Sequence, residues 1–387
     1  MKNDRSESME LSIILPTYNE EQGILVCLKE IKNTLPHLPS QTEVIIVDNK
    51  STDKTIALVR SVAHTIKNLT IVEESERGYG AACLKGLREG QGKYLFIADA
   101  DGTYNFTEIP RFLLKIHDHG DLVIGNRFGS AMQKGSMAWH HQYIGNPILS
   151  YLVRLFFKVK IHDIHCGARM ISKYAFERLT LYTRGMEFAS EMIIKAAQAH
   201  LLIEEIPITY RKRHGTSKLQ SFSDGWRHLR FILLYSPLFL FIIPGLILFF
   251  IGTMGMTLVY SGNIHIFDIE LFVHPLFFFA VMIIVGYQII FFGAFSKTYA
   301  ITHLGDSNTI LEKLFKNITI EKAGFAGIII SGIGASIYLY IFIAWIKSGF
   351  GSLNEIKNAT VALTLIVLGI QTFFSAFMLS IVGIKEK

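Results

Sequence analysis

The apolar residues of this chain follow two different patterns, and the pattern changes near residue 231. Before that point, short apolar runs alternate with stretches in which apolar and charged residues recur at helical spacing. After it come four long apolar stretches without Asp, Glu, Lys or Arg, each reaching the length of about 20 residues that a helix needs to cross a bilayer. We therefore expect a first domain over residues 1–230 and a membrane domain over residues 231–387. The four predicted transmembrane helices lie at about 237–260, 271–296, 323–346 and 360–384.

The first 230 residues show the alternation of strands and helices that is typical of an α/β fold. The predicted strands are short, apolar and mostly β-branched, as expected for a parallel sheet that is buried on both faces. We predict a mostly parallel, twisted sheet with strands at 11–15, 44–47, 69–72, 94–98 and 121–124. The predicted helices between them lie at 21–33, 53–64, 80–89 and 107–116.

Polar side chains and glycines follow each of the five predicted strands. In an open α/β sheet, ligands bind just outside the carboxyl ends of the strands. The fourth strand ends in Asp99-Ala100-Asp101, so two carboxylates stand one residue apart at this edge. Carboxylate oxygens suit Mg²⁺ or Mn²⁺, and Mg²⁺ typically combines one or two carboxylates with substrate phosphates. We expect Asp99 and Asp101 to hold such a cation against a diphosphate.

Charge and cysteine content predict where the first domain lies. The net charge of +6 favours contact with anionic lipid headgroups, whereas the basic-aromatic runs that stack on nucleic-acid bases are missing, so we expect no nucleic-acid partner. The start of the chain is polar and does not look like a signal peptide. The cysteines are widely spaced and fit reduced thiols. The loop after the second predicted span holds more lysines than the other two, which places it and the first domain in the cytoplasm; they are Lys297, Lys313, Lys316 and Lys322.

Nine short motifs along residues 11–235 together resemble the family 2 glycosyltransferases of the GT-A fold. The resemblance is strongest to the branch that transfers mannose or glucose to dolichyl or polyprenyl phosphate. The motifs are ILPTYNE at 14–20, VD at 47–48, STD at 51–53, GYGAA at 78–82, DADG at 99–102, GNR at 125–127, DIHCGAR at 163–169, FASEMIIK at 188–195 and YRKRHGTSKL at 210–219.

The resemblance implies a role for many of these positions. Asp99 and Asp101 would bind the diphosphate of a nucleotide sugar through Mg²⁺ or Mn²⁺. The other positions implied to contact that donor are Pro16, Tyr18, Glu20 and Asp48 at the nucleoside, with Gly78 and Ala100 beside them. The cations implied to meet the phosphate of the acceptor are Arg127, Arg211, Arg213 and Lys218.

Two positions depart from the pattern of the family. Where its members commonly have Asp-Asp-Gly, this chain has Asp48-Asn49-Lys50, which leaves the base preference open. Mannosyl members often have Gln two residues after the second aspartate of the pair, and Thr103 stands there in this chain. The sugar is therefore left open between glucose and mannose.

The acceptor decides whether the reaction needs a base. A hydroxyl must lose a proton to a nearby carboxylate, whereas a lipid phosphate is already anionic and needs cations to position it. Together with Asp101 and Arg127, Asp163 is predicted to be catalytic, as a second carboxylate that acts as a base, orients the acceptor or helps to hold the metal; the alternative is a cap of a helix or turn. Glu187 and Glu191 stand one helical turn apart and reach either the site or an arginine such as Arg169 or Arg184. The spacing of His162, Asp163, His165 and Cys166 is too cramped to favour zinc.

The favoured function is the inverting transfer of one hexose, from UDP-glucose or GDP-mannose, to dolichyl or undecaprenyl phosphate. The cell membrane of a bacterium or archaeon is a more natural setting than the endoplasmic reticulum. The alternatives are transfer to a lipid hydroxyl such as diacylglycerol, and a lipid carrier or flippase without enzymatic activity. A processive synthase would need a Gln-x-x-Arg-Trp motif, which the sequence lacks.

Two further stretches allow two interpretations each. Residues 146–159 form an amphipathic helix that packs on the sheet or lies in the membrane interface. Small residues in 324–336 fit close helix packing, including packing between protomers of a homo-oligomer.

Overall fold

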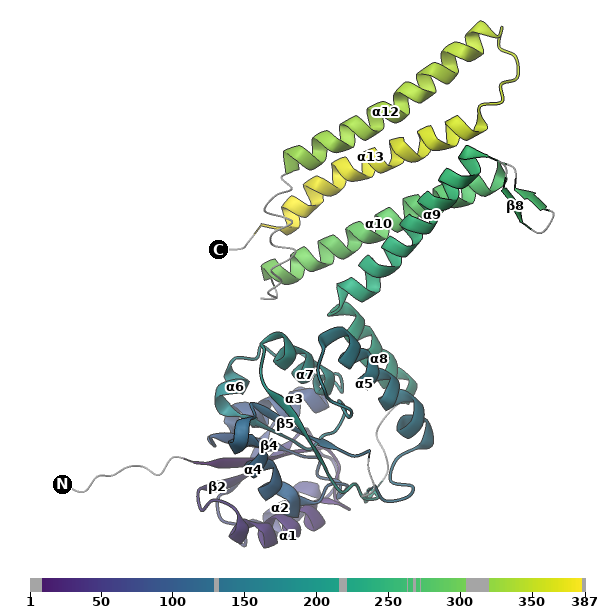
Figure 1. Cartoon of the computed structure of the whole chain (residues 1–387). Helices are drawn as coiled ribbons and strands as arrows, with labels where there is room; N and C mark the ends of the chain where they lie inside the picture. Colours follow the sequence, from purple (N-terminus) through teal and green to yellow (C-terminus); the bar gives the residue numbers. More distant parts are fainter. Residues whose placement is uncertain are drawn as a thin grey trace. The chain divides into compact units, whose positions relative to one another are not determined.

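The computed structural model describes residues 9–128, 132–215, 221–262, 264–266, 269–271, 273–303 and 320–384. The chain divides into two compact units, Met1–Tyr235 and Ser236–Lys387 (Figure 1). The predicted boundary at residue 230 falls inside α8 (Ser221–Leu234), the last helix of the first unit. Each unit is described by itself below.

A seven-stranded sheet forms the centre of the first unit, in the order β3-β2-β1-β4-β6-β5-β7. The five predicted strands are present, and the mostly parallel α/β architecture is confirmed. They are β1 (Leu11–Thr17), β2 (Thr42–Asp48), β3 (Leu69–Glu73), β4 (Tyr94–Ile97) and β5 (Leu122–Asn126). Two strands were not predicted, β6 (Arg169–Ser172) and β7 (Ile203–Pro207). The strand β6 runs antiparallel to both of its neighbours, β4 and β5, and every other pair in this sheet is parallel.

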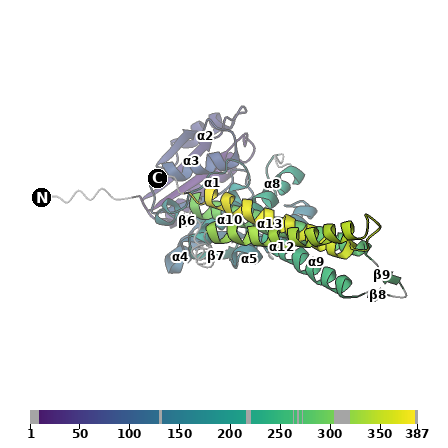
Figure 2. The same cartoon turned by 90° about the horizontal axis from the view of Figure 1, so that it is seen from above.

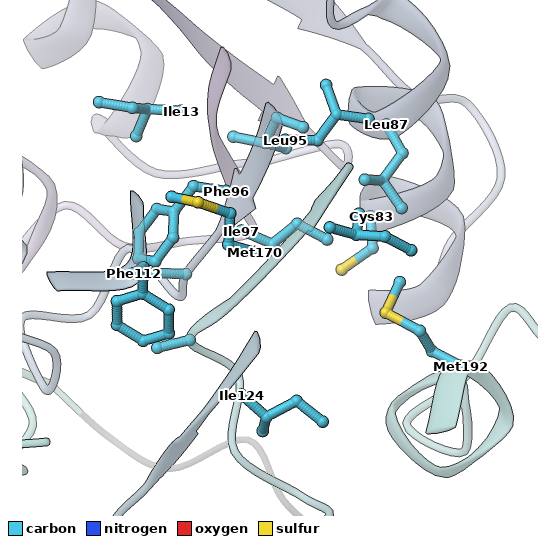
Figure 3. Packing of buried hydrophobic residues seen from close by; sticks show 14 of the residues in the cluster. Ile13, Cys83, Leu87, Leu95, Phe96, Ile97, Phe112, Ile124, Met170 and Met192 are labelled. Carbon is cyan, nitrogen blue, oxygen red and sulfur yellow. The ribbon is translucent and has the colours of Figure 1, made fainter. Parts of the chain in front are cut away.

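Helices cover both faces of this sheet. The ring of Phe112 in α4 lies 5.1 Å from that of Phe96 in β4, whereas Gly86 of α3 lies against Ile14 of β1. Ile13, not Ile14, is the residue paired with Phe96, so α3 and α4 lie on opposite faces. Figure 3 shows Phe96 beside Phe112, away from Cys83 of α3. The helices are α1 (Ile24–Thr34), α2 (Thr55–Ala63), α3 (Tyr79–Glu89), α4 (Ile109–His119), α5 (Asn146–Phe157), α6 (Lys173–Glu177), α7 (Phe188–Gln198) and α8.

The core of the first unit is built from the two central parallel strands and the helices against them. Every residue of β1 and β2 is buried, which explains why these strands appear in the sequence as continuous apolar runs. Cys27, Cys83 and Cys166 are also buried, and all three are free thiols. Burial raises the pKa of each of these thiols, that of Cys166 to about 12.

Apolar residues lie on two sides of the helix α5, whereas the sequence pattern predicted them on one side. Leu149 and Val153 pack into the core, while Ile148, Tyr151 and Leu155 are exposed. The helix ends at Lys158, which adopts the left-handed conformation with φ 56°. Packing on the sheet therefore accounts for one face of α5, and a second apolar face remains on the surface.

The described residues of the second unit contain four helices that are long and apolar enough to cross a membrane, in agreement with the four predicted spans. These spans are Leu238–Ser261, His274–Thr302, Glu321–Lys347 and Ile356–Val382. They belong to α9 (Ile243–Ser261) with the π-helical turn Leu238–Ile242 before it, α10 (His274–His303), α12 (Ile320–Lys347) and α13 (Ile356–Val382). Two short strands, β8 (Ile264–Ile266) and β9 (Ile269–Leu271), form a hairpin between α9 and α10, seen also in Figure 2.

Glycines set the contact between α12 and α13. A Cβ atom on Gly327 would lie 2.7 Å from the carbonyl oxygen of Gly369, and one on Gly369 would lie 2.3 Å from Oγ of Ser331. A side chain at either position would push the helices apart, because backbone approaches backbone there. Gly327 and Ser331, within the stretch 324–336, therefore serve packing within the chain. Polar side chains join α10 to α13, where Tyr287 and Thr372 share a hydrogen bond of 2.6 Å.

Candidate active site

Three neighbouring strands bring the predicted donor-binding residues together. The sheet order places β2, β1 and β4 side by side and parallel, so their carboxyl ends meet at one edge. Thr17 at the end of β1 pairs with Asp48 at the end of β2, and the amide of Ala98 donates to the carbonyl of Ile14 at 3.2 Å. The segments that begin at Pro16, Asp48 and Asp99 therefore form one rim.

Hydrogen bonds tie the loops after β1 and β2 to each other. The amide of Asn19 donates to Oγ of Ser51 at 3.0 Å, and Oδ1 of Asn19 accepts from the amide of Thr52 at 2.7 Å. The amide of Glu20 donates to Oγ1 of Thr55 at 2.8 Å. Tyr18 and Glu20 are held on this rim through their backbone neighbours, and the guanidinium carbon of Arg77 lies 5.7 Å from the centre of the Tyr18 ring.

The departure at Asp48-Asn49-Lys50 has a structural counterpart. The side-chain amide of Asn49 donates to the carbonyls of Glu74 and Glu76 at 3.1 and 2.6 Å, and its oxygen accepts from the amide of Gly78 at 2.8 Å. Lys50 adopts a left-handed conformation with φ 63°, which is the conformation that glycine takes most easily. Asn49 thus joins the loop after β2 to the loop after β3, and Asp48 is left as the acidic residue of the three.

Gly78 allows a close approach at the start of α3. Its φ is 145°, and a Cβ atom there would lie 2.1 Å from the carbonyl oxygen of Arg184. That carbonyl accepts from the amide of Ala81, and the carbonyl of Gly185 accepts from the amide of Gly80. The carbonyls of Arg184 and Gly185 therefore accept hydrogen bonds from two of the backbone amides at the beginning of α3, which have no partner within the helix.

Asp99 differs from Asp101 because one of its carboxylate oxygens has no hydrogen-bond partner in the described part of the chain. This oxygen, Oδ1, is shielded from solvent. Tyr79 lies near this carboxylate, and a Cβ atom on Gly167 would touch both of its oxygens, at 2.8 and 3.0 Å. Burial, and then the charge of Asp101, raise the pKa of Asp99 to about 6, while Arg213 and Arg127 oppose the shift.

Asp101 is buried, and both of its oxygens are engaged. The amide and the hydroxyl of Thr103 donate to Oδ1 at 3.0 and 2.6 Å. Nε and the terminal nitrogen of Arg213 each lie 2.6 Å from Oδ2. Thr103, the second departure from the family pattern, thus holds this carboxylate in place.

Residues 210–214, which we call the strap, lie along the loop that carries Asp99 and Asp101. The amide of Arg211 donates to the carbonyl of Thr103, and the amide of His214 donates to the carbonyl of Asp101, both at 2.9 Å. The ring of His214 covers Gly102, since a Cβ atom there would lie 2.5 Å from it. The guanidinium of Arg211 is paired with Glu30 of α1. Lys218, predicted to act with these arginines, lies outside the described residues.

Arg127 and Asp163 form a buried ion pair. Nε and the terminal nitrogen of Arg127 donate to the two oxygens of Asp163 at 2.7 and 2.8 Å, and the amide of Arg127 adds a third bond of 3.0 Å. Asp163 has no exposed surface, so this arrangement favours a role in orienting Arg127 over contact with an acceptor hydroxyl. The guanidinium carbon of Arg127 lies 5.2 Å from the centre of the Tyr210 ring, which connects it to the strap.

The two glutamates of α7 differ in their surroundings. Glu191 is buried and accepts hydrogen bonds from the amides of Tyr182 and Thr183, so it fixes the loop before α7. The arginines considered as its partners lie elsewhere: Arg169 donates to backbone carbonyls, and Arg184 pairs with Glu76. Oε2 of Glu187 is shielded and has no hydrogen-bond partner in the described part of the chain.

The residues present suit a divalent cation bound together with a substrate. Within the described ranges, no three His, Cys, Asp or Glu side chains gather as a metal site, so zinc finds no ligand set there. Asp99 and Asp101 supply hard oxygen donors, and Oδ1 of Asp99 is open. Such a pair fits Mg²⁺ or Mn²⁺ when the remaining ligands come from a diphosphate and water. Tyr79 and Gly167, which frame Asp99, were not assigned a role from the sequence, although both stand inside quoted motifs.

The sequence matches known glycosyltransferases. The family model described as "Glycosyl transferase family 2" matches residues 12–180. The model described as "Glycosyltransferase family 2 C-terminal transmembrane region" matches residues 294–383. Low-salt glycan biosynthesis hexosyltransferase Agl6 of Haloferax volcanii is 33% identical over 374 residues, covering 96% of this chain and 89% of that protein. Dolichyl-phosphate hexose transferase of the same organism is 28% identical over 217 residues, 56% of this chain and 89% of that protein. Among solved structures, glucosyl-3-phosphoglycerate synthase from Mycobacterium tuberculosis, in complex with phosphoglyceric acid, aligns with a TM-score of 0.47 and 18% identity, covering 60% of this chain and 81% of that one.

Proposed function

The chain belongs to glycosyltransferase family 2, and on this basis we propose that it transfers one hexose from a nucleotide-diphosphate sugar to a polyprenyl phosphate. The hexose is glucose or mannose, carried by UDP or GDP, and the acceptor is dolichyl or undecaprenyl phosphate. The reaction inverts the anomeric carbon and takes place at the cytoplasmic face of the membrane. The chain is an integral membrane protein with four spans.

One observation carries the proposal: Asp101 of the carboxylate pair is paired with Arg213, and Asp163, the candidate base, is buried and paired with Arg127. Arg213 lies against Asp101, and the charges of Arg213 and Arg127 both lower the pKa of Asp99, so both cations are near the carboxylate pair. Asp163 is engaged by Arg127 through both oxygens. A phosphate acceptor needs cations and no proton removal, and this set of residues supplies that combination. The name of one relative, dolichyl-phosphate hexose transferase, supports the same acceptor class.

The proposed role of each residue follows from its charge and its position at the site. Tyr18, Glu20 and Asp48 line the rim that receives the nucleoside, with Pro16, Gly78 and Ala100 as its backbone frame. Asp99 and Asp101 hold Mg²⁺ or Mn²⁺, which when bound offsets the charge that grows on the leaving diphosphate. Arg127, kept in place by Asp163 and Tyr210, positions the acceptor phosphate oxygen for attack at the anomeric carbon. The new bond joins that oxygen to the sugar, and the nucleoside diphosphate leaves with the electron pair of the broken bond.

The test is incubation of membranes that contain the protein with labelled UDP-glucose and, separately, with labelled GDP-mannose. We expect mass spectrometry to identify a labelled polyprenyl monophosphate hexose with one donor. Asp99→Ala should abolish the product. A labelled diacylglycerol glycoside, or a product that persists in the Asp99→Ala protein, would contradict the proposal.

A further inference from the structure

The proposed reaction requires a divalent cation and an acceptor phosphate to bind, and Arg213 is placed to affect both. It bonds Oδ2 of Asp101 through two nitrogens, both at 2.6 Å. The other oxygen of Asp101 is held by Thr103. A divalent cation that takes Oδ2 must therefore displace Arg213 or bind beside its positive charge.

The same side chain is suited to phosphate. A guanidinium binds a phosphate through two parallel hydrogen bonds, as it binds a carboxylate. Arg213 is only part-buried and lies on the strap, so it can turn to another anion more readily than Arg127, which Asp163 holds in the interior. The edge of the guanidinium that carries Nε faces Asp101, so a phosphate that takes this edge must displace the carboxylate.

We infer that Arg213 exchanges Asp101 for the acceptor phosphate, so that binding of the acceptor opens Oδ2 of Asp101 to the divalent cation. The inference rests on the proposed function, because it takes the acceptor to be a lipid phosphate and the carboxylate pair to be the cation site. Arg213 acts here as a positioning residue and a link between two ligands. Coupling of this kind is reciprocal: the acceptor tightens the binding of the cation, and the cation tightens the binding of the acceptor.

The exchange involves the side chain of Arg213 and not the backbone of the strap. Its backbone is fixed to the catalytic loop by the bonds from the amides of Arg211 and His214 to Thr103 and Asp101, so the side chain of Arg213 can turn while the strap stays in place. Arg211 is engaged with Glu30 rather than with Asp101. The two arginines are two positions apart in one segment and differ in their partner, which makes Arg211 a matched control.

The experiment measures Mn²⁺ binding without turnover. Mn²⁺ is titrated into the full chain in lipid nanodiscs at pH 8, and free Mn²⁺ is read by electron paramagnetic resonance, with and without farnesyl phosphate. For the wild type, farnesyl phosphate should lower the Kd for Mn²⁺ by about tenfold, a typical size of coupling between two sites. Arg213→Gln should bind Mn²⁺ about tenfold more tightly than the wild type without farnesyl phosphate, and the addition should then change the Kd by less than about twofold.

Arg211→Gln removes the same charge from the strap but should leave the Kd for Mn²⁺ without farnesyl phosphate within about twofold of the wild type. Coupling that persists in Arg213→Gln would overturn the inference, since it would come from direct attraction between phosphate and cation. If Arg213→Gln does not fold, Arg213→Lys, which keeps the charge but loses the fork, must show weakened coupling for the inference to stand. Absence of Mn²⁺ binding by the wild type with UDP or GDP present would instead reject the cation site of the proposed function.

Discussion

At the scale of single residues, the environment separates the two aspartates of the pair. Asp101 accepts two hydrogen bonds from Thr103 and forms an ion pair with Arg213. Asp99 keeps an open oxygen in a shielded place, and its pKa is raised to about 6. Asp101 is thus fixed by its partners, whereas Asp99 has a carboxylate oxygen that a cation could take.

The raised pKa of Asp99 predicts a stability effect with a definite sign. Between the ordinary value of 3.8 and about 6, the unfolded chain has released a proton that folded Asp99 retains. Rising pH therefore lowers the free energy of unfolding in that window. Asp99→Asn should raise stability at pH 8 with chelator present, by on the order of 2 kcal/mol, and should abolish transfer. Thermal melts at pH 5 and pH 8 check this, and an equal effect of the substitution at both values would contradict it.

Thr103 offers a test of how Asp101 is held. Thr103→Val keeps the shape of the side chain but removes the hydroxyl that donates to Oδ1 of Asp101. We expect kcat to fall by at least about tenfold, in line with the loss of roughly 1.5–3 kcal/mol for a hydrogen bond to a charged group. Thr103→Ser keeps the donor and should retain most of the activity. Steady-state kinetics with the preferred donor measure both, and equal losses in the two variants would show that the hydroxyl is not the cause.

At the scale of secondary-structure elements, the sequence shows those that are long, apolar and periodic. The strands β1 and β2 and the four spans are of this kind, because burial on all sides produces continuous apolar runs. The strand β6 has four residues and begins at Arg169, whose side chain is buried by donating to backbone carbonyls, so no apolar run announces it. The strand β7 is Ile-Glu-Glu-Ile-Pro, in which the glutamates hide the pairing with β5.

The candidate site was predictable to a similar degree. Asp99 and Asp101 follow from their place at a strand end, and the sheet order explains why the predicted rim residues meet. The pairing of Arg213 with Asp101 and of Arg211 with Glu30 joins residues far apart in the chain, with no local spacing to reveal it. The part of Asn49 in joining two loops is equally invisible, because it depends on where the carbonyls of Glu74 and Glu76 come to lie.

The contact between α12 and α13 leads to a prediction about glycines. Gly369→Val should destabilise the membrane unit by about 1–3 kcal/mol, because the added atoms meet Ser331 and the backbone of Gly327. Gly332 lies on the same helix as Gly327, but a Cβ atom there meets nothing within 4 Å. Gly332→Ala should be neutral or stabilising, since alanine is the better helix former. Melting in detergent, followed by circular dichroism, compares the two, and equal melting temperatures would contradict the packing described.

At the scale of the whole molecule, the chain combines a nucleotide-sugar fold with a membrane unit that lacks acidic and basic residues in its predicted spans. Charged residues inside a membrane usually mark a path for ions or solutes. Their scarcity in these helices favours anchoring and access to lipid over transport.

The distribution of lysines between the loops predicts the orientation. The first unit, the loop with Lys313 and Lys316, and the end of the chain should lie in the cytoplasm. Alkaline phosphatase, which is active only outside the cytoplasm, should be active when fused after Ser352, and a fluorescent protein should be bright when fused after Lys387. The reverse pattern would place the catalytic unit on the outer face and remove the cytoplasmic nucleotide sugars from its reach.

The burial of the cysteines has a practical consequence for watching this enzyme unfold. Cys27, Cys83 and Cys166 all belong to the first unit, and none is accessible in the folded state. A small thiol reagent can therefore react only after the surrounding structure has opened, and its rate reports the free energy of that opening. Because the membrane unit contains no cysteine, the signal comes from the catalytic unit alone, even in native membranes. The rate of thiol labelling therefore measures local opening of the catalytic unit without an added probe. Nucleotide sugar or metal should lower this rate to the extent that each one binds.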